Sequence, residues 1–134
     1  MNRKWLLLIG AADLLILSLL DKVAYQHFFY WRFGWYDTLM HLIGGLAIGL
    51  VSSWVYLEKK DRSLEPVLDW NKLLFFNFSF ALVIGLVWEL FELVFDRIVV
   101  FSLLDSLDDL LFGMAGSLLA GLLVGSLKKI KDKS

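Results

Sequence analysis

The chain has 134 residues, of which 59% are hydrophobic and 20% are charged, and its formal net charge is −1. A soluble domain of this length cannot bury so much apolar surface around one core, so the composition excludes an ordinary water-soluble protein and favours a single lipid-solvated domain over residues 1–134. The absence of cysteine excludes disulfides and thiolate metal sites, and no basic run interleaved with aromatic residues of the kind that binds nucleic acid is present.

Four apolar runs follow one another along the chain. A helix that crosses a membrane needs about 20 mostly apolar residues, and in lipid the backbone hydrogen bonds of such a run are satisfied within a helix. We therefore predict transmembrane helices over residues 5–20, 38–57, 73–95 and 110–127. The predicted fold class is all-α, a bundle of four transmembrane helices.

The first run also resembles a secretory signal peptide, because Arg3 and Lys4 precede its apolar residues. It ends at Asp21 and Lys22 without a small-residue cleavage site, so we expect this helix to be retained.

The basic residues are divided unequally between the two sides of this bundle, which predicts its orientation. Ten of the thirteen Lys and Arg residues precede the first run, lie between the second and third, or follow the fourth: Arg3, Lys4, Lys59, Lys60, Arg62, Lys72, Lys128, Lys129, Lys131 and Lys133. Lys22, Arg32 and Arg97 fall on the other side. Because cytoplasmic ends of spans are rich in Lys and Arg, we predict a multi-pass protein of the plasma membrane with both termini in the cytoplasm.

Residues 25–36 contain eight aromatic side chains in twelve positions. Aromatic rings favour the headgroup region, so we expect this segment to lie along the outer membrane surface as a short interfacial helix. It is either an ordinary aromatic belt or a platform for a lipid substrate.

Ionisable side chains gather at the ends of the runs that this topology places outside. Asp37 and His41 share one helix face, Glu89 and Glu92 lie one turn apart near the end of the third run, and Asp109 precedes the fourth. We predict that His41, Glu89, Glu92 and Asp109 bind a divalent metal ion (Zn, Mg, Mn or Ca) and that Asp37 holds the imidazole. The alternative for His41 is a histidine that is hydrogen-bonded within the bundle.

Three further residues are candidates for supporting roles around this site. Arg97 would be a counter-ion to Asp96 or Asp109, or a contact for an anion. Asp105 and Asp108, just before the fourth run, would contact the metal ligands or the substrate. The glycines of the second and fourth runs predict close helix packing instead, and these are Gly45, Gly49, Gly113, Gly116, Gly121 and Gly125.

The spacing of these residues resembles that of the VanZ-like membrane proteins. The pattern is Asp37-x3-His41, then Gly85-x3-Glu89-x2-Glu92-x4-Arg97, then Asp109-x6-Gly116. Glu92 stands where that family usually has Gln, and Gly113 where it has Asn; the Glu-x2-Glu form and the Asp-rich approach to the last run are more similar to the related YjdF-like inner-membrane proteins. The resemblance implies a prokaryotic cell-membrane protein and, for VanZ-like relatives, an association with glycopeptide resistance.

Three functions remain open at this level. The first is a metal-assisted hydrolase or transferase acting on a lipid or lipid-linked headgroup of the outer leaflet, with Glu89, Glu92 and Asp109 as its catalytic residues. The second is a non-catalytic protein that binds or modulates the cell envelope. The third is an ion or proton path, suggested by Asp13 in the middle of the first run, which we expect to face inward toward Asn77, Ser18 or a water molecule.

Overall fold

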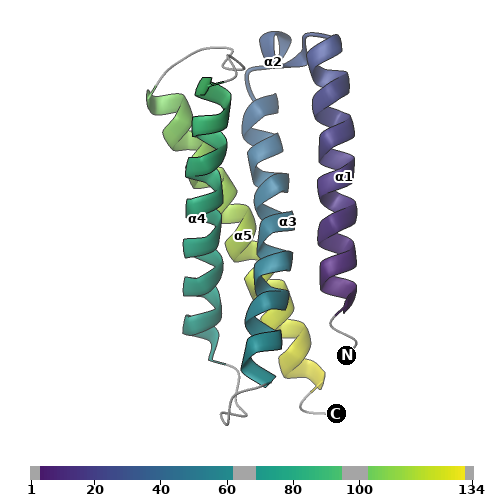
Figure 1. The fold of residues 1–134 in the computed structure, drawn as a ribbon, viewed down its shortest axis with the longest axis vertical. Coiled ribbons are helices and arrows are strands. Elements are labelled where there is room, and N and C mark those ends of the chain that lie inside the picture. The colour runs from purple at the N-terminus through teal and green to yellow at the C-terminus, as the bar shows by residue number, and fades with distance from the viewer. Residues whose placement is uncertain (1–3, 62–68, 95–102, 132–134) are drawn as a thin grey trace.

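The computed structural model describes residues 4–61, 69–94 and 103–131, which form five helices (Figure 1). They are α1 (Lys4–Gln26), α2 (Phe29–Arg32), α3 (Tyr36–Asp61), α4 (Trp70–Val94) and α5 (Leu103–Lys131). The four long helices run alongside one another, and the described residues contain no strand. The prediction of an all-helical bundle is confirmed.

Three of the long helices are long and apolar enough to cross a membrane. Among the described residues these candidate spans are Tyr36–Lys59, Trp70–Val94 and Leu103–Leu127. Helix α1 has 23 residues and is about 33 Å long, which is a sufficient length. It is nevertheless not among the candidate spans, because its ionisable side chains are too many: every stretch of 18 residues within it contains at least three of Lys4, Asp13, Asp21 and Lys22. Three of the four predicted spans are therefore supported directly.

The helix boundaries differ from the predicted ones because polar residues extend the helices beyond their apolar runs. Helix α5 begins at Leu103 instead of residue 110, with Asp105 in its first turn, where the helix dipole favours a carboxylate. Asp105 and Asp108 thus lie inside the helix. Helix α4 begins at Trp70 because Asp69 Oδ1 accepts a hydrogen bond from the Lys72 N–H at 3.2 Å, which caps the helix.

The aromatic segment forms the short helix α2, in agreement with the prediction of a short helix there. Phe28, which precedes it, has the left-handed backbone conformation with φ 59°. This turn between α1 and α2 brings the aromatic segment back over the end of the bundle (Figure 1).

Helix α3 lies at the centre of the bundle and contacts α1, α4 and α5, whereas the described residues of α1 and α4 do not contact each other. Its packing against α5 depends on glycines. A Cβ atom on Gly45 would overlap the Gly113 backbone, and one on Gly116 would overlap the Leu42 carbonyl oxygen. The predicted close approach of these helices is confirmed.

A buried polar network joins α3, α4 and α5 in the middle of the bundle. Asn77 Oδ1 accepts a hydrogen bond from the Ser52 hydroxyl at 2.8 Å, and Asn77 Nδ2 donates one to Ser53 Oγ at 2.8 Å. The Ser117 hydroxyl donates to the Asn77 carbonyl oxygen at 3.0 Å. All four residues are fully buried. Asn77 therefore has its partners on α3 and α5, so of the three alternatives that we gave for Asp13, a contact with Asn77 is not found.

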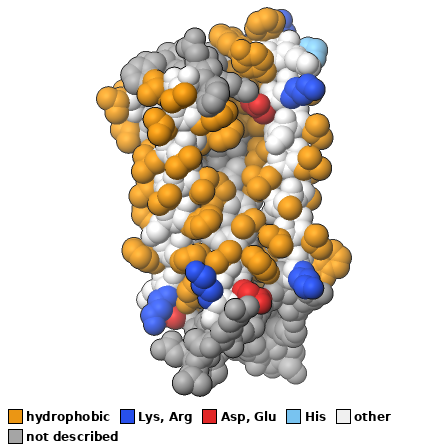
Figure 2. All heavy atoms as spheres, in the orientation of Figure 1, with side chains coloured by type: hydrophobic (Ala, Val, Ile, Leu, Met, Phe, Trp, Pro, Cys, Tyr) orange, Lys and Arg blue, Asp and Glu red, His pale blue; other side chains and the backbone are white. Residues whose placement is uncertain are grey.

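The outer surface of the bundle is apolar, and its hydrophobic core is small. Only eight hydrophobic residues are buried among the described residues, and four of them are alanines. On the face that Figure 2 shows, apolar side chains are spread between the two ends of the molecule. Such a surface is typical of helices surrounded by lipid.

Candidate functional site

Three helices deliver carboxylates and an imidazole to the same end of the bundle, where α2 lies. Asp37 is in the first turn of α3, and His41 lies one turn further along the same face. Glu89 and Glu92 lie in the last two turns of α4, and Asp109 lies in the second turn of α5. The five residues that we expected to meet come from three separate segments, and the structure brings them together.

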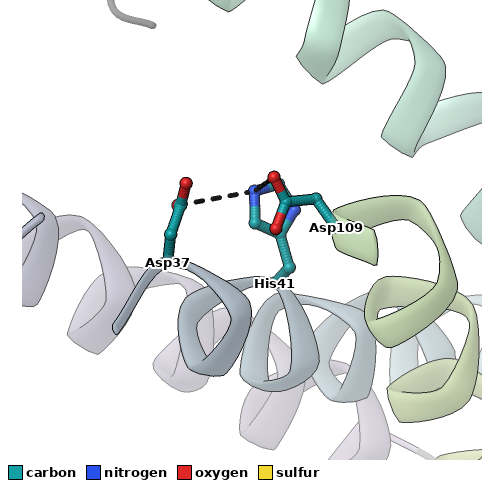
Figure 3. A group of neighbouring side chains, drawn as sticks. All are labelled: Asp37, His41 and Asp109. Carbon is teal, nitrogen blue, oxygen red and sulfur yellow. Dashed lines mark ion pairs between the residues drawn. The ribbon is translucent and has the colours of Figure 1, made fainter. Parts of the chain in front are cut away.

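The His41 imidazole lies between two carboxylates (Figure 3). Its Nε2 is 3.7 Å from Asp37 Oδ1 and 3.7 Å from Asp109 Oδ2. The side chains of His41 and Asp109 are only 13% and 6% exposed, whereas that of Asp37 is 33% exposed. Both distances exceed those of a hydrogen bond, and a single Nε2 can donate at most one N–H. This nitrogen therefore faces two acceptors at distances too long to satisfy either.

His41 also belongs to a second group, formed with Glu89 and Glu92. One ligand atom from each of these three residues lies within 4.8 Å of the others. The same holds for His41 with Asp37 and Asp109. Glu89 Oε1 is buried without a hydrogen-bond partner in the described part of the chain. The imidazole is thus the common member of two carboxylate pairs.

A cavity of about 550 Å³ opens beside this cluster. Its polar lining comes from Asp21, Tyr30, Asp37, His41, Glu92 and Asp109, together with Ser18. Within the described residues, no lysine or arginine lines it. A cavity with several carboxylates and no basic side chain is suited to a cation.

The sequence analysis missed one polar contact of the cavity. The Tyr30 hydroxyl donates a hydrogen bond to Asp21 Oδ1 at 2.9 Å, which ties α2 to the end of α1. Burial, together with the bond to Asp21, raises the pKa of Tyr30, so its phenol is a neutral donor. The position of Asp21 at the end of an apolar run, next to an aromatic segment, was the available signal.

Two other predicted residues do not join the cluster. Asp105 and Asp108 are exposed on α5 and do not line the cavity. Arg97, the third, lies outside the described residues, as does Asp96. Among the described residues, the cluster consists of Asp37, His41, Glu89, Glu92 and Asp109.

The separations between these side chains are compatible with a shared ion. Metal–ligand distances of about 2.0–2.1 Å place neighbouring ligand atoms about 2.8–3.4 Å apart, from octahedral to tetrahedral geometry. The 3.7 Å separations around His41 Nε2 exceed this range by a few tenths of an ångström. One imidazole with several carboxylates suits zinc or manganese better than magnesium or calcium, which prefer oxygen ligands alone.

Comparison with known proteins assigns the chain to a family. The family model described as "Predicted membrane protein (DUF2238)" matches residues 3–129, and the chain therefore belongs to this family. No curated protein and no solved structure matches it. The match supports a membrane protein and does not bear on the VanZ-like or YjdF-like resemblance.

Proposed function

Because the chain belongs to a family of predicted membrane proteins, we propose that all four long helices cross the plasma membrane, with the cluster in the outer half of the bilayer. Helix α1 lies alongside the other spans (Figure 1) and exposes a row of apolar side chains that includes Leu8, Leu15 and Leu19. The start of α1 and the end of α5 lie at the same end of the bundle. The concentration of basic residues at that end favours its placement in the cytoplasm.

We propose that the cluster binds a divalent metal ion and uses it on a lipid or lipid-linked headgroup of the outer leaflet, as a hydrolase or transferase. The observation that carries this proposal is that two carboxylate pairs share His41. Glu89 Oε1 is buried without a hydrogen-bond partner among the described residues, and an ionised carboxylate in a membrane needs a partner. A divalent cation shared with His41 would supply it.

A bound divalent ion would supply a Lewis acid for a phosphoryl or carbonyl oxygen, and it would make bound water more acidic. Glu89 and Glu92 are our candidates for the base: Glu92 lines the cavity, and the buried Oε1 of Glu89 has no hydrogen-bond partner among the described residues. The Ser18 hydroxyl, which also lines the cavity, donates to the Leu14 carbonyl oxygen at 2.9 Å. Water is therefore the proposed nucleophile.

A non-catalytic envelope protein of the glycopeptide-resistance type is the second candidate. Four of the residues that carry the VanZ-like resemblance, Asp37, His41, Glu89 and Asp109, are members of the cluster. Such a protein would hold the ion and a headgroup without turnover. An ion path is not favoured, because the end of the cavity away from the cluster is lined by apolar side chains.

Elemental analysis of the detergent-purified protein tests the metal site. The variants are His41→Ala and Glu89→Gln, with Asp108→Asn as a matched control that removes an exposed carboxylate outside the cluster. We expect about one Zn²⁺ or Mn²⁺ per chain in the wild type and the control, and at least a tenfold loss of affinity in His41→Ala. A wild-type protein that holds no stoichiometric metal after loading would contradict the proposal.

Turnover separates the two candidates once metal is found. An enzyme would hydrolyse a member of a lipid panel only with metal present, and Glu89→Gln would abolish this activity. Stoichiometric metal without turnover on any lipid would support the binding protein.

A further inference from the structure

The cavity beside the cluster is open on the side of the bundle, between α1 and α4. It is lined by both helices, although their described residues do not contact each other. Leu14 of α1 and Ile84 and Trp88 of α4 line it and are still 43%, 38% and 45% exposed. Figure 2 shows a furrow along this face, with acidic atoms near its upper end. In a membrane, such an opening faces lipid.

The two ends of this cavity differ in polarity. Four members of the cluster (Asp37, His41, Glu92 and Asp109) and the Asp21–Tyr30 pair form one end, and away from them the walls are apolar. The apolar walls include Leu14, Leu17, Ile48, Val51, Phe80 and Ile84. The cavity thus combines a polar end with an apolar groove that opens sideways.

The length of the groove matches the depth of one leaflet. From His41 to Val51 the α3 wall runs ten residues, or about 15 Å at 1.5 Å per residue. The hydrocarbon core of one leaflet is also about 15 Å deep, half of a core of about 30 Å. A water-soluble ligand would use the polar end alone, whereas a lipid would use both ends.

We propose that the cavity takes up one phospholipid from the surrounding leaflet, sideways between α1 and α4. Its phosphate would meet the metal ion, and one acyl chain would lie along the apolar groove. The charges of the cavity favour this arrangement, because its described lining contains carboxylates and no lysine or arginine, and the proposed cation would attract a phosphate to them. The proposal rests on the proposed metal site and names the substrate class of that site.

Groove-filling substitutions test this proposal. Leu17→Trp and Ile84→Trp enlarge side chains that line the groove on α1 and α4. Ile16→Trp and Val83→Trp are the matched controls, because these neighbouring side chains are 53% and 59% exposed and do not line the cavity. Each protein is purified in detergent with added phosphatidylglycerol, and bound phospholipid is counted by native mass spectrometry while metal is measured by elemental analysis.

We expect about one phospholipid per chain in the wild type and both controls, and at least a fivefold loss in the two groove-filling variants, with the metal content of all five proteins unchanged. Removal of the metal with a chelator should release the lipid from the wild type.

Equal lipid retention in all five proteins would contradict lipid binding in the groove and would not affect the proposed metal site. Lipid that stays bound after chelation, or inorganic phosphate that binds at the metal while no preparation holds lipid, would also overturn the proposal. Absence of metal from every protein would instead contradict the proposed metal site, on which the lipid proposal depends.

Discussion

Replacement of Asn77 by leucine should destabilise the bundle. The Asn77 side chain is fully buried and forms hydrogen bonds with α3 and α5. Leucine has the same branched shape and keeps the side chain apolar, but it removes every one of these bonds. Ser52 would retain its bond to the Gly49 carbonyl oxygen at 3.2 Å, whereas Ser53 would lose its bond to the amide.

The expected cost follows from the two shortest bonds, which join Asn77 to Ser52 and Ser53 at 2.8 Å each. Hydrogen bonds between membrane helices contribute about 0.6 kcal/mol on average and about 1.7 kcal/mol at most. Two such bonds give a loss of about 1–3 kcal/mol in the free energy of unfolding. The 3.3 Å contacts of Nδ2 with the carbonyl oxygens of Gly49 and Ser117 are longer and add less.

Reversible unfolding in mixed micelles of dodecyl maltoside and SDS, followed by circular dichroism, measures this loss. Asn71→Leu is the matched control, because Asn71 is exposed at the start of α4 and its replacement should change stability by less than about 0.5 kcal/mol. Equal stability of the two variants would refute the view that the Asn77 network holds the three helices together.

Three further changes have definite expected outcomes. Gly45→Val should weaken the packing of α3 on the Gly113 backbone by about 1–3 kcal/mol or prevent folding, measured by the same unfolding assay. Tyr30→Phe should lower stability by about 1 kcal/mol and increase hydrogen exchange in α2, because it removes the bond to Asp21. Removal of the metal by a chelator should lower the Tm of the wild type, because an ion present at about 100 times its Kd stabilises the folded protein by about 2.7 kcal/mol. The Tm of His41→Ala should not change on chelation.

The sequence was sufficient to predict the fold class and the convergence of the site. Long apolar runs specify helices in lipid, and an alternating direction of spans brings the start of α3, the end of α4 and the start of α5 to one end. The four-residue spacing of Asp37 and His41 specifies a shared helix face, and in the structure Asp37 Oδ1 lies 3.7 Å from His41 Nε2. These features depend on local periodicity and on topology, which a single sequence contains.

The features that the sequence analysis missed depend on contacts between distant segments. One asparagine within an apolar run has no periodic signal, and its partners Ser52, Ser53 and Ser117 lie 24 to 40 residues away. The extension of α5 to Leu103 was missed for another reason: its first turns are acidic, and hydropathy detects the apolar part of a helix only.

The two polar clusters of this bundle differ in a way that bears on function. In the Asn77 network, the hydroxyl and amide groups are joined by bonds of 2.8–3.3 Å, as expected of polar groups that serve only to join helices. About 18 Å along α4, the His41 cluster has 3.7 Å separations and a buried Glu89 oxygen without a partner in the described chain. Unsatisfied polar groups are costly in a membrane, so packing alone gives no reason to retain this arrangement. A ligand that enters the cluster would supply the missing partner, and we propose a cation for this ligand because carboxylates surround His41.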